Sequence, residues 1–291
     1  MRITGNRMID LAAASTAKAQ TNVAAASAEV DSGLRVATPS DDPSAWVAAQ
    51  RTKLRQVMSQ GAGAAVATSR DNLTVSDNSL ASIGSVLSQV RTLAVQASSD
   101  TYNPANRAGL GLQVQGLFKT AIDSANAQGT TGEYLFGGTQ SLTAPFDPNG
   151  VYTGDNATRS VPSDGSTTAN VTIPGTTLTA ASGVDVLPLL SKVATALSAN
   201  DLPTLLSTLP DLDTAIKQVS TARTQAGGAM NVLDATTTAR GVLEDNMTAA
   251  ISRMTESDTI SSASELAKAT QSLEVSRTVA SKVIQILSPT A

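Results

Sequence analysis

The chain has 291 residues, of which 41% are hydrophobic but only 2% are aromatic, so Ala, Val, Leu and Ile must supply most of the packing, as in slender helical rods. It contains no cysteine and no histidine, which excludes disulfides, thiolate metal sites and imidazole ligands or catalysts. The formal net charge of −4 argues against nucleic acid or an anionic membrane as the main partner, because a negatively charged chain is not attracted electrostatically to either.

The sequence has no pattern of a cleaved leader or of a membrane span. Arg7 and Asp10 interrupt the region where a signal peptide would need its apolar core. There is also no apolar run of the roughly 18 residues that a membrane helix requires. We therefore expect either a cytoplasmic protein or one exported without a cleaved leader.

A weak helical stripe comes first in the chain. Its members are mostly small, so we expect the helix to be marginal without a partner. Gly33 suits the left-handed position that ends a helix, and Pro39 with Pro43 favours an extended connection to residue 42. Residues 1–42 are thus predicted to be an assembly helix and linker. The stripe alternates spacings of three and four: Ile9, Ala12, Thr16, Ala19, Val23, Ala26, Val30 and Gly33.

The longest predicted helix covers residues 43–99, with Asp42 as its cap and Pro43 at its first position. It would be roughly 85 Å long. After a turn at Asn103-Pro104, residues 105–127 are predicted to form a helix that folds back antiparallel. We assign residues 43–128 to the first half of a helical rod. The long helix carries a seam with three-four spacing: Val66, Ser69, Leu73, Ser76, Leu80, Ile83, Leu87, Val90, Ala94 and Ala97.

The composition changes at residues 129–183, which are rich in Gly, Thr, Ser, Asn and Asp. Turn residues bound several short β-type runs, which predicts a small β domain inserted between helices. The runs are 133–136, 151–153, 159–161, 170–173 and 177–178.

Helical patterns return after the insertion, at 184–200 and 201–209, and then from Asp211 in a second long arm weakened at Gly227-Gly228. We assign residues 184–261 to the second half of the rod and 262–291 to a C-terminal assembly helix. Its stripe is Ser262, Leu266, Ala269, Leu273, Ser276, Ala280, Val283 and Leu287. The predicted fold is mainly α, a long antiparallel rod with a small inserted β domain and termini that are disordered or weakly ordered in the monomer. Residues near 20 should lie opposite residues near 275.

The carboxylates Asp41 and Asp42 could form a metal or acid–base pair, but their place before a helix favours a capping role by about four to one. Asp211 and Asp213 have the same interpretation. The glycines at 109, 111 and 116 do not fit a dinucleotide fingerprint. We expect no enzyme activity, no cofactor and no metal site.

The seams could form the core of a soluble helical bundle, or they could be surfaces that become buried when many copies of the chain assemble. The weakness of both terminal stripes favours assembly. In the second arm, a glycine at 227 is expected to mark close approach of the neighbouring rod, so that Gly227→Leu would disrupt packing. The predicted assembly contacts are Ile9, Val23, Val30, Leu266, Leu273, Val283 and Leu287.

Several motifs resemble the flagellin-like family of flagellar axial proteins. The N-terminal signature is Met1-Arg2-Ile3-Thr4, then Ser32-Gly33-Leu34-Arg35-Val36 and Thr38-Pro39-Ser40-Asp41-Asp42-Pro43. A middle group of motifs resembles the hook-associated protein 3 branch rather than a flagellin. It consists of Glu133-Tyr134-Leu135-Phe136-Gly137-Gly138-Thr139, Pro145-Phe146, Gly150-Val151-Tyr152 and Gly154-Asp155, with Arg159 and Val161. Arg223, Gly227, Asn231 and Leu233 match the C-terminal signature.

The resemblance implies a structural protein at the junction between flagellar hook and filament, exported unfolded through the type III channel and assembled as a ring outside the cell. It implies as partners other copies of the chain, hook-associated protein 1, flagellin and an export chaperone, with no nucleic acid and no membrane. A minor flagellin that forms the filament itself is the close alternative. A soluble helical signalling bundle is a more distant one.

Overall fold

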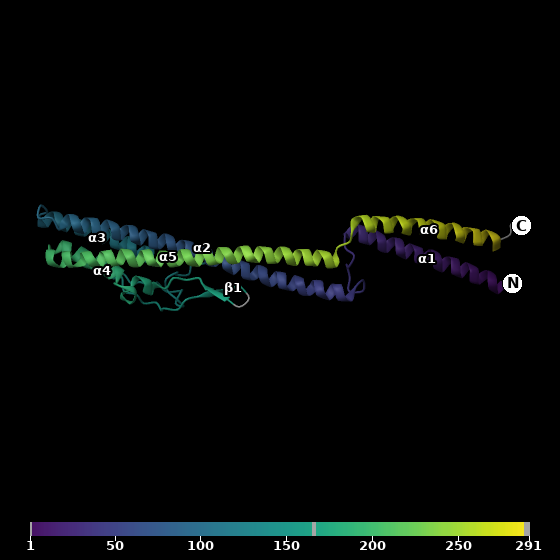
Figure 1. The fold of residues 1–291 in the computed structure, drawn as a ribbon, viewed down its shortest axis with the longest axis horizontal. Helices are drawn as coiled ribbons and strands as arrows, with labels where there is room; N and C mark the ends of the chain where they lie inside the picture. Colours follow the sequence, from purple (N-terminus) through teal and green to yellow (C-terminus); the bar gives the residue numbers. More distant parts are fainter. Residues whose placement is uncertain (1, 165–166, 288–291) are drawn as a thin grey trace. The chain divides into compact units, whose positions relative to one another are not determined.

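The computed structural model describes residues 2–164 and 167–287. In chain order its elements are α1 (Arg2–Ser32), α2 (Pro43–Ala97), α3 (Pro104–Ala125), β1 (Ser160–Asp164), β2 (Thr167–Asn170), the 3₁₀ helices η1 (Gly175–Leu178) and η2 (Ala180–Ser182), α4 (Val186–Ser198), α5 (Leu202–Thr255) and α6 (Thr259–Leu287) (Figure 1). The expectation of a mainly α-helical chain is confirmed. None of the described helices is long and apolar enough to cross a membrane.

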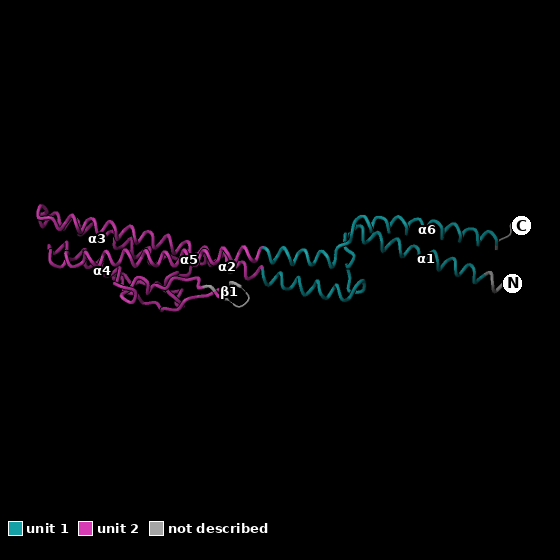
Figure 2. The backbone as a smooth tube through the Cα atoms, viewed as in Figure 1, with its two compact units in different colours: residues 1–59, 242–291 teal, residues 60–241 magenta. Residues whose placement is uncertain are grey.

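The chain divides into two compact units (Figure 2). Residues 1–59 and 242–291 form unit 1, and residues 60–241 form unit 2. The five-part division made from the sequence uses different boundaries and stays a prediction. Unit 1 is built from two segments that lie far apart in the sequence, whereas unit 2 is one continuous stretch of chain.

The start of α2 is capped as expected. The Asp42 carboxylate accepts hydrogen bonds from the backbone N–H groups of Ser44 (3.1 Å) and Ala45 (3.0 Å). Pro43, which has no N–H to satisfy, occupies the first helical position. The boundary was predictable because both signals are local in the sequence.

The core of unit 2 follows the seam of α2. Every residue predicted to lie on that seam is buried except Ser69, which is half-buried. The seam packs against α5, whose buried residues include Leu212, Val219, Ala226 and Leu233. Small side chains alternate with Leu and Val on both helices, which explains how a core with few aromatic residues is filled.

Three ion pairs between α2 and α5 show that the helices are antiparallel, because the partner's residue number falls as the first one rises. They join Arg70 Nε to Asp234 (2.5 Å), Asp77 to Arg223 Nε (2.9 Å) and Arg91 Nε to Asp213 (2.5 Å). Five of the six side chains are about half-exposed, so water screens the attraction within each pair and its contribution to stability is small. Their main effect is on register rather than on stability.

A buried arginine joins the two turns at one end of unit 2. Arg107 on α3 is only 6% exposed. Its guanidinium donates to the carbonyl oxygens of Ala97 (2.9 Å) and Ser99 (3.1 Å), and to Asn200 Oδ1 (2.8 Å) between α4 and α5. Arg107 thus ties the α2–α3 turn to the α4–α5 turn with hydrogen bonds to neutral acceptors.

The insertion contains less regular β structure than expected. Strands β1 and β2 form one antiparallel hairpin, with Ser160 opposite Asn170. The runs at 133–136 and 151–153 contribute only the isolated bridges Gln128–Tyr134 and Phe146–Tyr152. The prediction of β structure at 177–178 is wrong, because these residues lie in η1. Apolar residues of these runs serve as core side chains instead: Phe136, Val171, Ile173 and Leu178 are buried, as is Phe146 between two of the runs.

One glutamine fixes the end of the insertion on α5. The buried amide of Gln218 accepts from Val184 N (2.9 Å) and donates to the carbonyl oxygens of Thr177 (2.9 Å) and Thr179 (3.0 Å). Its chemistry is specific, because a carboxylate in the same place could not donate to carbonyl groups.

We therefore expect Gln218→Glu to lower the free energy of unfolding by about 2–3 kcal/mol, since buried acceptors lose their donors. Chemical denaturation monitored by circular dichroism measures this. Gln225→Glu, an exposed change on the same helix, is the control and should be close to neutral. Equal stability of the two variants would contradict the role given to Gln218.

Unit 1 contains the two terminal helices side by side, with the start of α1 and the end of α6 at the same end of the pair (Figure 1). α1 ends at Gly33, whose φ is +68°, as its predicted left-handed role requires. Ser257 N donates to Gly33 O (2.9 Å) and Ser257 Oγ donates to Glu29 (2.5 Å). The pairing of residues near 20 with residues near 275 stays a prediction.

Candidate assembly surfaces

The terminal stripes face one another but are incompletely covered. Ala19 and Ser262 are buried, whereas Ile9 and Val30 are 40% and 39% exposed. The predicted contacts Val23, Leu266, Leu273 and Val283 are half-buried. The side chain of Leu287, the remaining predicted contact, lies outside the described residues. The α1–α6 pair thus uses the predicted stripes and leaves apolar area free on both helices.

The terminal helices carry further apolar side chains that the sequence analysis missed. On α6 they are Ile260, Val275, Val279, Ile284 and Ile286, and on α1 they are Met8 and Leu11, all more than half exposed. Val275, Val279 and Ile286 have spacings of four and seven, so a second search for helical periodicity would have found them. A helix that is apolar on more than one face is normally buried by more than one partner.

The rest of unit 1 shares this property. Val47, Leu54, Val57 and Met58 on α2, and Val242 and Leu243 on α5, are exposed. Most of the exposed large hydrophobic side chains of the described chain lie in unit 1, although it is the smaller unit. Unit 1 is therefore the candidate assembly surface.

The N-terminal signature residues build the connection between α1 and α2. Arg35 donates through its backbone N–H to Thr255 O (2.8 Å) and through its guanidinium to Met254 O (3.0 Å), and it lies 3.7 Å from the Asp42 carboxylate. Pro39 is exposed in the turn that Asp41 closes. These contacts hold the linker against the end of α5.

The carboxylates of this signature bind backbone groups. Asp41 accepts from the N–H groups of Thr38 (2.7 Å) and Ala37 (3.0 Å). Hydrogen bonds, first from the Thr38 N–H, lower the pKa of Asp41, and the Ala45 N–H is the main cause that lowers the pKa of Asp42. Each carboxylate has its own set of N–H donors, which supports the capping interpretation over a shared metal or acid–base role.

The middle motif shapes a tight turn inside the insertion. Phe136 is fully buried, and its carbonyl oxygen accepts from Gly175 N (2.9 Å) and the Tyr152 hydroxyl (3.0 Å). Gly138 has φ of +69°, and a Cβ there would collide with the Asp155 side chain. A Cβ on Gly137 would lie 2.7 Å from Gln140 O. Both glycines are therefore required by close packing.

The C-terminal signature has a different outcome. Arg223 pairs with Asp77 on α2, but Asn231 is exposed. A Cβ at Gly227 would meet no other group within 4 Å. The expected close approach of the neighbouring rod at Gly227 is therefore wrong, and Gly227→Leu has no buried packing to disrupt.

We expect Gly227→Ala to raise the free energy of unfolding by up to about 1 kcal/mol, because alanine is the better helix former and has room here. Thermal unfolding of the purified variant measures the change. Gly137→Ala, where a Cβ would clash with backbone, should instead destabilise. A destabilised Gly227→Ala variant would show that the residue needs its lack of a side chain.

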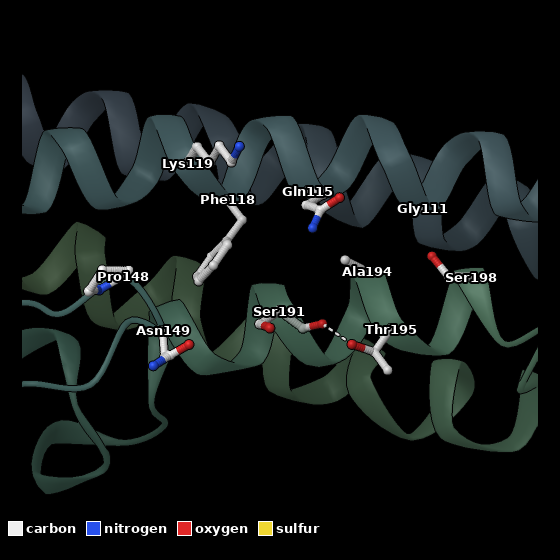
Figure 3. A pocket seen from close by; sticks show the side chains of 10 residues that line it. All are labelled: Gly111, Gln115, Phe118, Lys119, Pro148, Asn149, Ser191, Ala194, Thr195 and Ser198. Carbon is white, nitrogen blue, oxygen red and sulfur yellow. Dashed lines mark hydrogen bonds between the residues drawn. The ribbon is translucent and has the colours of Figure 1, made fainter.

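A cavity of about 400 Å³ lies between α3 and α4 in unit 2, beside the loop at Pro148 and Asn149 (Figure 3). Phe118 points into it, and the Thr195 hydroxyl donates to Ser191 O (3.0 Å). Lys119 is the one titratable side chain among its lining residues. A single amine without a neighbouring acid or base in the lining suits polar contacts rather than acid–base chemistry.

Comparison with known families agrees with the arrangement of the helices. A family model of the bacterial flagellin N-terminal helical region matches residues 3–141, and a model of the bacterial flagellin C-terminal helical region matches residues 209–287. Together the two matches cover well over half of the chain. The chain belongs to the bacterial flagellin family. The flagellin-family regions contain α1 to α3 and most of α5 with α6, whereas β1, β2 and α4 lie between them.

Curated proteins similar to this chain include the flagellar hook-associated protein 3 of Escherichia coli (strain K12), which is 30% identical over 129 residues. The match covers 43% of this chain and 40% of that protein, so the chain spans about two-fifths of the length of this curated relative. FlgL from Bacillus cereus is 20% identical, with a TM-score of 0.59 over 70% of this chain and 99% of that one. The flagellar junction protein FlgL from Legionella pneumophila is 15% identical, with a TM-score of 0.54 over 72% of this chain and 100% of that one. These two likenesses show a shared fold.

Proposed function

We propose that this flagellin-family chain is a structural component of the bacterial flagellum that joins the hook to the filament. The observation that carries the proposal is the apolar surface of unit 1, where both terminal helices cover one another on one stripe and expose other apolar residues. The names of its relatives, hook-associated protein 3 and flagellar junction protein, support the position within the flagellum.

The proposal includes assembly and export. Copies of the chain would form a ring through unit 1, with hook-associated protein 1 on the hook side and flagellin on the filament side. Before assembly, an export chaperone would hold the chain for the flagellar type III channel, and the assembled protein would lie outside the cell. Long paired helices that expose apolar side chains in unit 1 suit this structural role better than an enzymatic one.

A minor flagellin is the second candidate, because both family models that match the chain describe flagellins. Incubating the purified chain with filament seeds separates the candidates. A junction protein should add a short cap and stop. Growth of long filaments from this chain alone would show that it is a flagellin.

The isolated monomer should be cleaved by proteases within residues 1–35 and 262–291 first. The α1–α6 pair leaves Leu11 and Ile286 76% and 79% exposed, so the area it buries offsets little of the entropy lost on ordering two helices. Limited proteolysis with mass spectrometry locates the cuts. Resistance of both termini in a protein shown to be monomeric would contradict assembly-coupled ordering.

A further inference from the structure

The segment of α2 in unit 1 has two distinct faces. Its inner face carries Ala49, Thr52, Gln56 and Ser59, which are buried or half-buried, and Gln56 Nε2 donates to Thr248 Oγ1 on α5 (2.9 Å). The opposite side carries Val47, Leu54 and Met58, which we name the outer stripe. Around the helix axis, the directions of these three residues lie within roughly 40° of one another. Their exposed fractions are 46%, 63% and 68%.

Positive charge surrounds the outer stripe. Arg51, Lys53 and Arg55 lie between its members, and residues 43–59 contain no acidic residue. None of these three cations forms an ion pair among the described residues. A segment with a charge of +3 in a chain of net charge −4 is an unpaired basic surface with an apolar centre.

The second long helix of unit 1 carries a complementary surface. On α5, Val242 and Leu243 are exposed, and Glu244 and Asp245 follow them without an ion pair among the described residues. Val242, Asp245 and Ala249 share one helical face by their spacing. All three are exposed, whereas Met247 and Ile251 on the inner side are half-buried. We name Val242, Asp245 and Ala249 the acidic stripe.

We propose that the outer stripe of one copy packs against the acidic stripe of a second copy, with Arg51 and Arg55 near Asp245. The two stripes cannot meet within one copy, because the inner faces of α2 and α5 are already in contact through Gln56 and Thr248. Because the contact joins two different surfaces, it can repeat from copy to copy in one direction and so build a ring or a helical array. The inference rests on the proposed function and names the residues through which copies recognise one another.

Charge reversal tests this pairing. Arg51→Glu alone and Asp245→Arg alone should each lower the amount of the chain on sheared flagella about tenfold relative to the amount exported into the medium, because like charges then face one another. The double variant should recover at least half of the wild-type amount. A double variant as defective as the single variants would overturn the pairing.

Cross-linking tests the same contact without relying on motility. The chain has no cysteine, so Leu54→Cys and Val242→Cys, placed in separate co-expressed chains, cannot form a disulfide within one chain. Oxidised flagella should yield a dimer that contains both variants. Leu112→Cys in unit 2, also at an exposed leucine, replaces Leu54→Cys as the control and should yield none.

The outcomes separate this inference from the proposed function. Absence of the wild-type chain from sheared flagella refutes the proposed function. If the wild-type chain is present on sheared flagella but the Leu54→Cys and Val242→Cys variants form no dimer, the pairing alone is refuted. A dimer of Leu54→Cys chains with one another, or with another flagellar protein, refutes the pairing in the same way. Binding of the purified chain to anionic vesicles that Arg51→Glu abolishes would instead assign the outer stripe to a membrane.

Discussion

Leu273→Asp is expected to abolish incorporation of the chain into the flagellum while leaving unit 2 folded. Leu273 is the central large residue of the inner stripe of α6, flanked at heptad spacing by Leu266 and Ala280, and all three are half-buried against α1. Surrounded by further copies, the carboxylate would be buried without a partner, at a cost on the order of 3 kcal/mol or more. In the monomer the α1–α6 pair is weak and the same carboxylate reaches water.

The measurement combines thermal unfolding of the purified variant with detection of the protein on flagella after its export has been confirmed. Gln271→Asp introduces the same carboxylate at an exposed position of α6 and should incorporate normally. A loss of monomer stability greater than about 1 kcal/mol would place Leu273 in the monomer core. Motile cells that carry the variant on their flagella would remove this stripe from the assembly interface.

Arg107→Met should cause the largest loss of monomer stability, about 3 kcal/mol. Methionine fills much of the same space, but it leaves the carbonyl oxygens of Ala97 and Ser99 and the Asn200 side chain without the donors they have in the wild type. Unsatisfied buried acceptors carry most of the expected cost. The turns at this end of unit 2 would also lose their cross-connection.

Arg91→Met is the matched control, because Arg91 also pairs α2 with a distant residue but is 45% exposed. Exposed ion pairs contribute at most about 1 kcal/mol. Chemical denaturation should therefore give a clearly lower free energy of unfolding for Arg107→Met than for Arg91→Met. The reverse order would mean that the register-fixing ion pairs, and not the buried network, stabilise unit 2.

The helices could be predicted from the sequence because their signals are local and repeated. The seam from Val66 to Ala97 is almost entirely buried, and the cap at Asp42 and the stop at Gly33 lie where the sequence placed them. The insertion was harder, because its short β-type runs are equally compatible with single bridges and with core side chains on loops. Leu178 shows this most clearly, since it is buried from a 3₁₀ turn.

The buried polar residues gave no signal that periodicity detects. Arg107 and Asn200 are far apart in the sequence and meet only because four helices converge. Gln218 looks like any polar residue on a helix until the insertion folds back onto it. Gly227 shows the opposite error, because a glycine in a helix does not by itself indicate a close neighbour. The extra apolar residues of α6 were missed because only one stripe per helix was sought.

We propose that copies of this chain occupy the junction between hook and filament. Gold-labelled antibodies against the purified chain, applied to intact flagella and imaged by electron microscopy, test this position. We expect label at a single position between the hook and the filament on each flagellum. Label along the whole filament would identify a flagellin, and unlabelled flagella from cells that export the chain would contradict the account.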